Sequence, residues 1–268
     1  MIPQKVGFVG LGNMAQAMLK RWLSSGALSK DAVFGYDPNA SLCDSLHTSL
    51  GITIVDDNAE LVTRCDILVL AVKPQYADNA LTQISAVNLS DKPVLSIVTG
   101  LTTDALKRRL PGALIMRCMP NTPAMVGEGV FAISSFHTFS EELYAWTVQL
   151  LENCGRVFLV REGDLEAVTG LSGSGPAYGF IFIEAMADAG VRLGLPRAMA
   201  YEMAAQTLLG AGKMAVESGQ IPAALKDAVC SPGGTTIEAV YALEKAGFRS
   251  AVMDAVCASA GKAAVLRG

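Results

Sequence analysis

The stretch with the clearest chemical potential is residues 228–239, which read Ala-Val-Cys-Ser-Pro-Gly-Gly-Thr-Thr-Ile-Glu-Ala. The Pro-Gly-Gly within it forces a turn, because proline fixes φ and glycine accepts positive φ at little cost. Thr235 followed by Glu238 has the spacing of a capping box. This spacing predicts a helix that begins at Thr235 or Thr236.

A helix that begins just after a glycine turn presents unpaired backbone N–H groups and a partial positive charge. The hydroxyls of Ser231, Thr235 and Thr236 stand beside that helix end, so the stretch predicts an anion site. The same pattern also fits an ordinary turn and helix cap. The rest of the chain decides between the two interpretations, because it shows whether the protein can also bind a reductant that would act on an anionic ligand.

A second glycine-rich turn lies near the start of the chain. Lys5–Val9 is a short apolar run, followed by Gly-Leu-Gly-Asn-Met-Ala at 10–15 and a helical pattern over Gln16–Leu23. A strand, G-x-G-x-x-A and a helix in this order form the dinucleotide-binding fingerprint. Gly10 permits the tight turn, Gly12 lets the backbone approach a pyrophosphate, and Ala15 lets helix and strand pack closely.

The second predicted strand, Ala32–Asp37, ends in an acidic residue. An acidic side chain here usually accepts hydrogen bonds from the adenosine ribose, which favours NAD over NADP. No lysine or arginine follows between Pro38 and Leu50. Asp37 also fits a cap of the turn before the next helix, so the preference between the two cofactors stays open.

Helices and near-continuous apolar strands alternate as far as Val160, which predicts a parallel sheet covered by helices on both faces. Ligands of such sheets bind at the carboxyl ends of the strands. We therefore expect the site to be lined by Gly10–Ala15, Ala71–Pro74, Val98–Gly100 and Met119–Thr122.

Strand patterns disappear from Asp164 onward, which predicts a dinucleotide-binding domain at residues 1–162 and an all-helical domain at 163–268. The predicted helix Ala177–Leu193 is apolar on nearly every side and therefore needs neighbours on every side. Small residues in the following helices permit close helix approach, so we expect a homodimer built through this half. A self-sufficient helical bundle is the alternative. Residues 172–176, Ser-Gly-Ser-Gly-Pro, are expected to form a hinge between helices.

The composition excludes several classes of function. The 268 residues are 51% hydrophobic with a net charge of −4, which is typical of a compact protein without the basic surface that nucleic acids require. No apolar run reaches membrane-spanning length and the chain begins directly with a strand, so neither a membrane span nor a signal peptide is expected. Six scattered cysteines without CxxC or a Cys/His cluster favour a cytoplasmic protein without a metal site.

With these elements in place, the chain closely resembles the pyrroline-5-carboxylate reductases, the last enzymes of proline biosynthesis. The resemblance runs from GLGNMA at 10–15 and AVKP at 71–74, through MPNTPA at 119–124 and GLSGSGPAY at 170–178, to LKDAVCSPGGTTIEAV at 225–240. It implies reduction of Δ1-pyrroline-5-carboxylate to L-proline by NADPH or NADH. It also implies a Rossmann-type dinucleotide-binding domain followed by a helical dimerisation domain, with dimers that often assemble into decamers.

The resemblance also implies roles for single residues. The substrate carboxylate would lie on the backbone N–H groups of Gly234 and Thr235, and Thr236, as the catalytic residue, would hydrogen-bond the ring nitrogen. The expected substrate-binding residues are Ser231, Gly233, Gly234, Thr235, Thr236 and Glu162. The fingerprint, the sheet edge and the resemblance together predict cofactor contacts at Gly10, Leu11, Gly12, Asn13, Met14, Ala15, Asp37, Asn58, Ala71, Val72, Lys73, Pro74, Val98, Thr99, Gly100, Pro120 and Asn121.

The implied chemistry explains why the sequence offers no catalytic histidine or lysine. A protonated cyclic imine is already an electrophile, so the protein needs only to hold its carbon near nicotinamide C4 and exclude water. A β-hydroxyacid dehydrogenase also opens with GLGNM, but it needs a lysine after its glycine-serine motif and residues 177–190 contain none. A nucleotide sensor without turnover is the alternative of another class, and the intact 231–236 stretch speaks against it.

Overall fold

The computed structural model describes residues 3–266. They divide into two compact units, one formed by the chain up to Ser174 together with the stretch from Ala258 onward, the other by Gly175–Cys257. The predicted domain boundary at residue 162 lies before the short helices that precede Ser174, and it stays a prediction.

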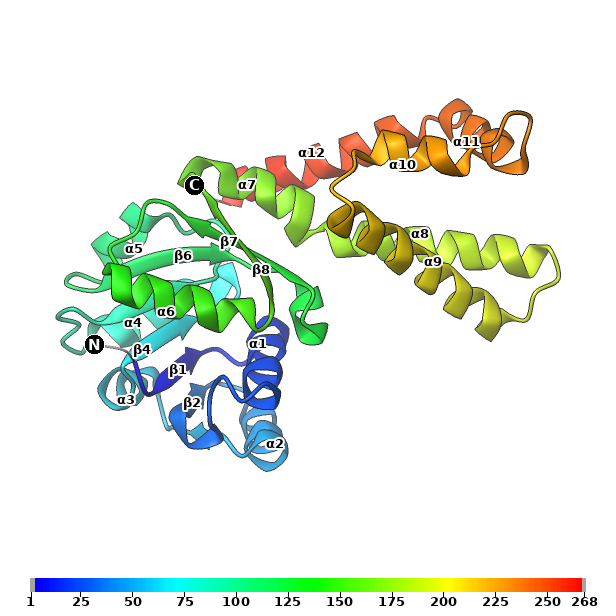
Figure 1. Cartoon of the computed structure of the whole chain (residues 1–268). Helices are drawn as coiled ribbons and strands as arrows, with labels where there is room; N and C mark the ends of the chain where they lie inside the picture. The colour runs from blue at the N-terminus through cyan, green and yellow to red at the C-terminus, as the bar shows by residue number, and fades with distance from the viewer. Residues whose placement is uncertain (1–2, 267–268) are drawn as a thin grey trace. The chain divides into compact units, whose positions relative to one another are not determined.

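The first unit is an eight-stranded sheet with helices on both faces (Figure 1). In chain order its elements are β1 Val6–Val9, α1 Asn13–Ser24, β2 Val33–Tyr36, α2 Ala40–Leu50, β3 Thr53–Ile54, α3 Asn58–Arg64, β4 Ile67–Leu70, α4 Pro74–Ser85, β5 Pro93–Ser96, α5 Thr103–Arg109, β6 Leu114–Met119, β7 Gly129–Ser134, α6 Glu141–Glu152, β8 Gly155–Val160 and α7 Leu165–Val168. A π-helical turn, Thr169–Gly173, follows α7.

The strand order is β3-β2-β1-β4-β5-β6-β7-β8, and one pair departs from the predicted parallel sheet. Strands β1 to β6 pair in parallel, but β7 runs antiparallel to β6, with Cys118 opposite Ile133. The link between them, residues 120–128, is a 3₁₀ turn rather than a helix. So short a link cannot make the crossover that a parallel neighbour needs.

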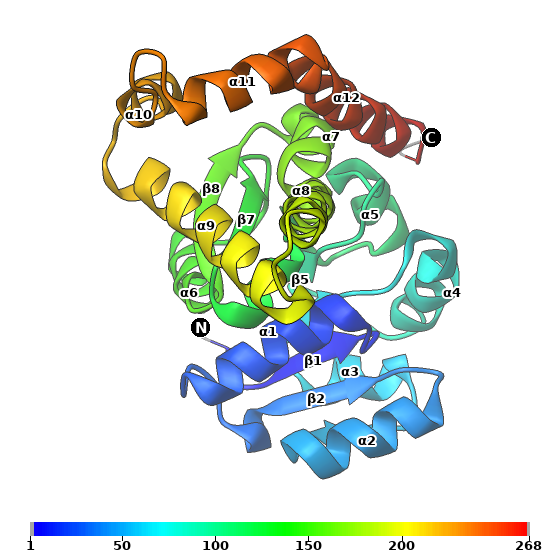
Figure 2. The same cartoon turned by 90° about the vertical axis from the view of Figure 1, so that its right-hand side faces the viewer.

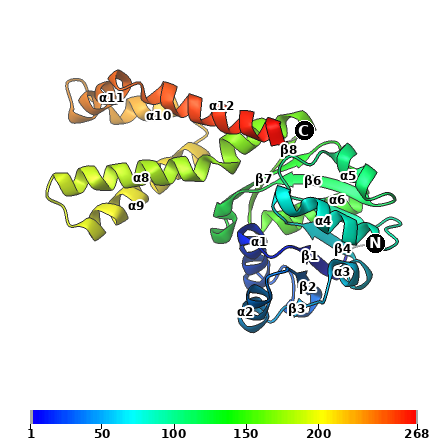
Figure 3. The same cartoon turned by 180° about the vertical axis from the view of Figure 1, so that it is seen from behind.

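Two hydrophobic clusters lie on opposite faces of the sheet. One cluster is built with α1, α2 and α6, and its members include Met18, Leu46 and Leu151. The other is built with α3, α4 and α5, and includes Leu61, Leu81 and Leu106; Figure 3 shows these helices from behind. Burial of β1 and β4 on both faces explains why they read as continuous apolar runs in the sequence.

Helix α4 was not predicted. Lys73-Pro74-Gln75 indicates the end of a strand, and β4 does end just before it, at Leu70. Pro74 then becomes the first residue of α4, a position that tolerates proline because its missing N–H has no partner inside the helix. The buried residues Ala77, Leu81 and Ile84 follow at helical spacing.

The second unit is helical, as predicted, and consists of α8 Gly175–Arg192, α9 Arg197–Glu217, α10 Pro222–Val229, α11 Thr235–Lys245 and the start of α12 Phe248–Leu266. Helices α8 and α9 pack against each other as a hairpin (Figure 2). Residues 172–176, expected to form a hinge between helices, contain the end of a π-helical turn and the start of α8, and the boundary between the two units falls between Ser174 and Gly175. Their role as a hinge stays a prediction.

This unit buries very little of its apolar surface. The buried residues of its helices are the alanines Ala187, Ala200 and Ala204, whereas Phe180 and Ile181 on α8 are 65% and 66% exposed. An apolar cavity of about 360 Å³ lies between α8 and the α11–α12 region, lined by Phe182, Phe248 and their neighbours. The helices thus keep apolar faces that no described residue covers.

Trp22 anchors the core of the first unit. It lies on α1, fully buried, with its ring centroid 5.7 Å from that of Phe8 on β1. We expect Trp22→Ala to lower the free energy of unfolding by about 3–5 kcal/mol, because it removes apolar contacts and leaves a cavity. Trp22→Phe keeps an aromatic ring and should lose less than half as much. Urea unfolding followed by circular dichroism measures both, and equal losses would contradict this packing role.

Candidate functional site

The carboxyl ends of the parallel strands open into a cavity of about 550 Å³. All four segments predicted from the sheet edge contribute to its lining, and a fifth contribution comes from the turn after α7. Its lining residues are Gly12, Asn13, Met14, Ala71, Val72, Lys73, Ile97, Thr99, Met119, Pro120, Thr169, Gly173 and Ser174.

The glycine-rich turn lies at one end of this cavity. Gly10 has a φ of +90°, and a Cβ there would lie 2.9 Å from a methyl carbon of Val72. Gly12 is the N-cap of α1 without a side-chain cap, and a Cβ on it would meet no atom within 4 Å. Backbone N–H groups of the first turn of α1 therefore face open space. This arrangement fits a pyrophosphate.

The sequence left two roles open for Asp37, an acceptor for the adenosine ribose and a cap of the turn before α2. Its carboxylate accepts a hydrogen bond from the backbone N–H of Leu11 at 2.9 Å and another from that of Asn39 at 3.0 Å. It therefore ties the end of β2 to the glycine-rich turn. A carboxylate has further lone pairs, so contact with a ribose stays a prediction.

A smaller cavity of about 90 Å³ lies beside Gly10, between the ends of β1 and β2 and helices α3 and α4. Asn58 lines it and donates from Nδ2 to Oε1 of Gln83 at 2.7 Å. Its Oδ1 is buried and has no hydrogen-bond partner among the described residues. Tyr36 and Tyr76 line the same cavity. Aromatic rings and an unused amide acceptor fit an adenosine, the part of the cofactor that the family resemblance implies for Asn58. This contact stays a prediction.

Some predicted cofactor residues lie behind the cavity rather than in it. Val98 is 3% exposed and packs into the sheet core, while its neighbour Thr99 lines the cavity. Pro120 lines the cavity, but the amide of Asn121 accepts from the N–H of Val130 and donates to the carbonyl of Ser172. Leu11 and Ala15 are fully buried, Pro74 is the first residue of α4, and none of the three is among the lining residues. Direct cofactor contact by these residues stays a prediction.

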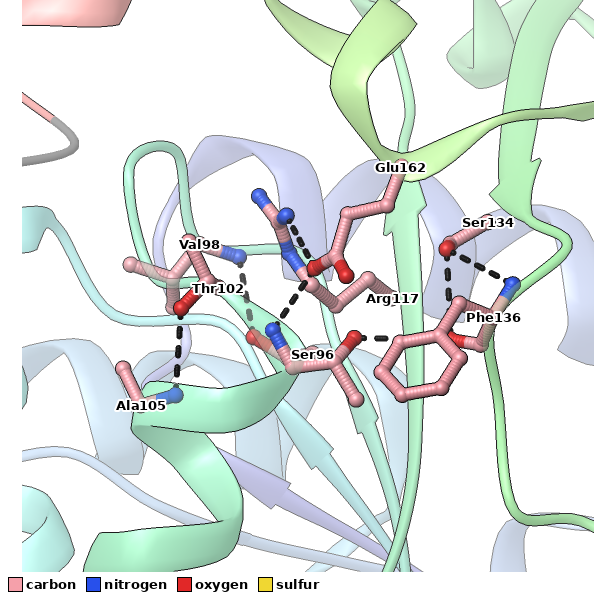
Figure 4. A network of polar contacts seen from close by, with 9 residues as sticks. Ser96, Val98, Thr102, Ala105, Arg117, Ser134, Phe136 and Glu162 are labelled. Atoms are coloured by element: carbon pink, nitrogen blue, oxygen red, sulfur yellow. Dashed lines mark hydrogen bonds and ion pairs between the residues drawn. The ribbon is translucent and has the colours of Figure 1, made fainter.

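Sequence reasoning missed Arg117 as a site residue. It lies on β6, two residues before Met119, and is 3% exposed. Its guanidinium contacts the Glu162 carboxylate at 2.7 Å (Figure 4). The signal in the sequence was its charge within an apolar strand just before the motif at 119–124, because an arginine on a buried strand needs a partner.

Glu162 joins three segments of the chain. Its Oε1 accepts hydrogen bonds from the Arg117 Nη1 and from the backbone N–H of Thr103, the first residue of α5, each at 2.7 Å. Burial alone would raise the pKa of Glu162, but these hydrogen bonds outweigh it and hold the pKa below the usual value of a glutamic acid. The group is therefore a carboxylate at neutral pH. The predicted contact of Glu162 with substrate stays a prediction.

The segments near this pair are held by further hydrogen bonds, shown in Figure 4. Thr102 caps α5 by accepting from the N–H of Ala105 at 3.1 Å, and the Ser96 hydroxyl accepts from the N–H of Val98. Ser134 closes a turn through the carbonyl and N–H of Phe136. The loop between β5 and α5 is thus fixed at both ends.

The predicted substrate loop lies in the second unit, between α10 and α11. Gly233 has a φ of +66°, and a Cβ on Gly234 would lie 2.3 Å from the Ser231 hydroxyl. Helix α11 begins at Thr235, as predicted, but the capping box does not form. The N-cap is Gly234, and no side chain caps the helix. The first N–H groups of α11 therefore remain available to an anion.

Comparison with known proteins connects these features to a family. A family model described as pyrroline-5-carboxylate reductase dimerisation matches residues 162–266, and one described as NADP oxidoreductase, coenzyme F420-dependent, matches residues 5–100. The pyrroline-5-carboxylate reductase of Escherichia coli (strain K12) is 42% identical over 254 residues, which cover 94% of each chain. The chain belongs to the pyrroline-5-carboxylate reductase family.

Further members of the family support the assignment over the whole length. The Arabidopsis thaliana pyrroline-5-carboxylate reductase is 38% identical over 265 residues, covering 96% of this chain and 93% of the relative. The crystal structure of Plasmodium falciparum pyrroline carboxylate reductase with NADP bound superposes with a TM-score of 0.88 at 34% identity, covering 98% of each chain. The predicted fold, a Rossmann-type domain followed by a helical one, is confirmed.

Proposed function

We propose that this protein reduces Δ1-pyrroline-5-carboxylate to L-proline with NADPH or NADH. Membership of the reductase family carries this assignment, and the cavity at the glycine-rich turn supports it with residues that fit a dinucleotide. A reduced nicotinamide bound there would supply a hydride to the imine carbon.

The cofactor site works by positioning. The N-terminus of α1 binds the pyrophosphate through backbone N–H groups, and Asn58 accepts from the adenosine ribose. Thr99 and Pro120 line the cavity and would border the nicotinamide. No acid is needed to polarise the substrate, because the protonated imine is already electrophilic. The task of the chain is therefore orientation and the exclusion of water.

The substrate site works by hydrogen bonding. The uncapped N-terminus of α11 binds the substrate carboxylate through the N–H groups of Gly234 and Thr235, with the Ser231 hydroxyl beside them. Thr236 orients the ring nitrogen, as acceptor from the iminium N–H or as donor to the nascent amine. A hydroxyl is a poor general acid near neutral pH, so its role is orientation.

The reaction is tested by the loss of absorbance of NADPH, and in parallel of NADH, on addition of pyrroline-5-carboxylate. Rapid oxidation that depends on the imine is the expected result, and the ratio of the two rates gives the cofactor preference that Asp37 leaves open. If both cofactors bind but neither is oxidised, the protein is a nucleotide sensor. If a β-hydroxyacid is oxidised instead, the reaction belongs to the dehydrogenase class.

We further propose that two copies form a homodimer through the helical half. The family model for this half describes dimerisation, and the exposed apolar faces of α8 and its neighbours need a cover. Light scattering should give twice the mass of the chain or, if dimers assemble further, ten times that mass. A stable monomer at micromolar concentration would contradict the dimer.

The proposal also includes a cytoplasmic location and a small molecule, rather than a membrane or nucleic acid, as the binding partner. None of the helices described within residues 3–266 is long and apolar enough to cross a membrane. All six cysteines are free thiols, which supports the cytoplasm as the compartment. The acidic net charge supports a small-molecule substrate rather than nucleic acid.

A further inference from the structure

Two segments line part of the large cavity, and the Glu162 carboxylate, which is paired with Arg117, connects them through the N–H of Thr103. The first is the loop from Ile97 to Thr103, and the second is the stretch from Glu162 to Ser174. We infer that the ion pair of Arg117 with Glu162 positions groups for the reaction. It does so by holding these two segments, the walls of the cavity, in a fixed position relative to each other. This inference rests on the proposed function, because it assigns the walls to the nicotinamide half of the cofactor.

The carboxylate of Glu162 fixes the first wall. Its Oε1 accepts from the backbone N–H of Thr103 at 2.7 Å, which is the first N–H of α5 and has no partner inside the helix. A carboxylate at a helix N-terminus is also favoured by the helix dipole. Thr99, four residues earlier in the same loop, lines the cavity. Moving Glu162 therefore moves the loop that carries Thr99.

The second wall is attached through the same residue. Glu162 leads into α7, whose Leu165 packs against Met119 and Ala132. The carbonyl of Ser172 accepts from Asn121 at 3.0 Å. Thr169, between these two attachments, lines the cavity. The ends of β6 and β7 thus hold this stretch by apolar packing, by one amide and by the ion pair.

Arg117 completes the connection from the sheet. Its side chain is 4% exposed and that of Glu162 is 16% exposed, so water screens the pair little. Removing one partner of such a pair leaves a buried charge without compensation. Thr99, Met119 and Thr169 border both the large cavity and the small pocket that Arg117 lines. The pair therefore lies directly behind the space assigned to the nicotinamide.

This arrangement assigns Glu162 a role different from substrate binding. One carboxylate oxygen already accepts from two donors of the chain. In our inference Glu162 acts through Arg117 and Thr103, so the loss of either partner should have the same effect as the loss of Glu162. A substrate ligand would behave differently, because Arg117 and Thr103 would then matter little.

Thr103→Pro gives the sharpest test. Proline is favoured at the first position of a helix, and Thr102 before it is extended, with φ −74° and ψ 158°, as the residue before a proline should be. The substitution removes the N–H that binds Glu162 and keeps the Thr102 cap. Thr103→Val measures the loss of the hydroxyl separately. Glu141→Pro places a proline at the matching position of α6, after its cap Ser140, as a control outside the site.

The readout separates the two halves of the cofactor. ADP-ribose carries the adenosine and pyrophosphate, whereas NADH adds the nicotinamide. In Thr103→Pro, Glu162→Gln and Arg117→Met we expect the Kd of ADP-ribose by calorimetry to stay within about twofold. We expect NADH to lose about tenfold in affinity and kcat to fall about ten- to a hundredfold, as for a small misplacement of reacting groups. When the hydride of the reduced cofactor is replaced by deuteride, the rate should fall by a larger factor in the variants than in the parent.

Two results would overturn the inference. A melting temperature that falls while the folded variants keep their kcat and their NADH affinity would show a purely structural pair. A raised KM for pyrroline-5-carboxylate in Glu162→Gln alone, with Arg117→Met and Thr103→Pro like the parent, would show a direct substrate contact. The NADH and ADP-ribose affinities need no turnover. They therefore test the pair even if the parent protein fails to reduce the imine, which would overturn the proposed function instead.

Discussion

Gly12→Val is expected to raise the Kd of NADH and of ADP-ribose by at least about a hundredfold, which is roughly 2.8 kcal/mol. Gly12 lines the cavity at the N-terminus of α1, and a Cβ on it meets no protein atom within 4 Å. The new side chain therefore occupies the space of the ligand rather than of the protein. Isothermal titration calorimetry measures the affinity without any need for turnover.

The fold should tolerate this substitution. Gly12 has a φ of −65° and an extended ψ, a conformation open to valine. The melting temperature should therefore stay close to that of the parent, and Gly12→Ala should give a smaller loss of affinity than Gly12→Val. Tight binding of ADP-ribose by a folded Gly12→Val protein would show that the pyrophosphate does not lie at this turn.

Thr236→Ala is expected to lower kcat/KM for pyrroline-5-carboxylate by about ten- to a thousandfold, the loss typical of one hydrogen bond made in the transition state. Thr236 is the second residue of α11, and its backbone and hydroxyl stand at the uncapped helix end. If the hydroxyl orients the ring nitrogen during hydride transfer, most of the loss appears in kcat. Initial rates at saturating cofactor separate kcat from KM.

Two further variants make this result specific. Thr236→Ser keeps a hydroxyl and should recover most of the activity. Thr207→Ala removes an exposed threonine hydroxyl on α9 that donates to the carbonyl of Met203 in the same helix, and serves as the control. The affinity for NADH should stay unchanged in Thr236→Ala. Parent-like kinetics in that variant would refute the role of Thr236.

Much of the fold could be predicted because local signals agree with the final structure. The sequence predicts helices over Ala40–Leu50 and Glu141–Glu152, and the structure shows α2 and α6 with these bounds, each beginning after a side-chain cap, Asn39 and Ser140. The direction of β7 could not be predicted from apolar pattern, since a buried strand reads the same in either direction. Only the length and shape of the link after β6 decide it.

The candidate site was predictable where it follows from topology. Gly12, Lys73, Thr99 and Pro120 come from four separate strand ends, and the rule for parallel sheets brings them to one edge. Arg117 was not predictable in this way. Its partner Glu162 lies 45 residues further along the chain, and no local pattern links a strand arginine to a glutamate beyond two further strands and a helix.

The substrate loop shows where a local rule is incomplete. Thr235 and Glu238 have the spacing of a capping box, yet the helix begins one residue too early for it and Gly234 is the N-cap. A side-chain cap would use the N–H groups that an anion needs. A capping box and a bound carboxylate would thus use the same backbone N–H groups of α11.

The helical unit has few buried side chains, so its stability should depend on the protein concentration. Ala187, Ala200 and Ala204 bury too little apolar area to offset the loss of chain entropy over five helices. Mass action then makes the melting temperature rise with protein concentration. An enzyme of this construction is most fragile when it is most dilute, so a nanomolar assay sample should lose activity on standing while a concentrated stock keeps it.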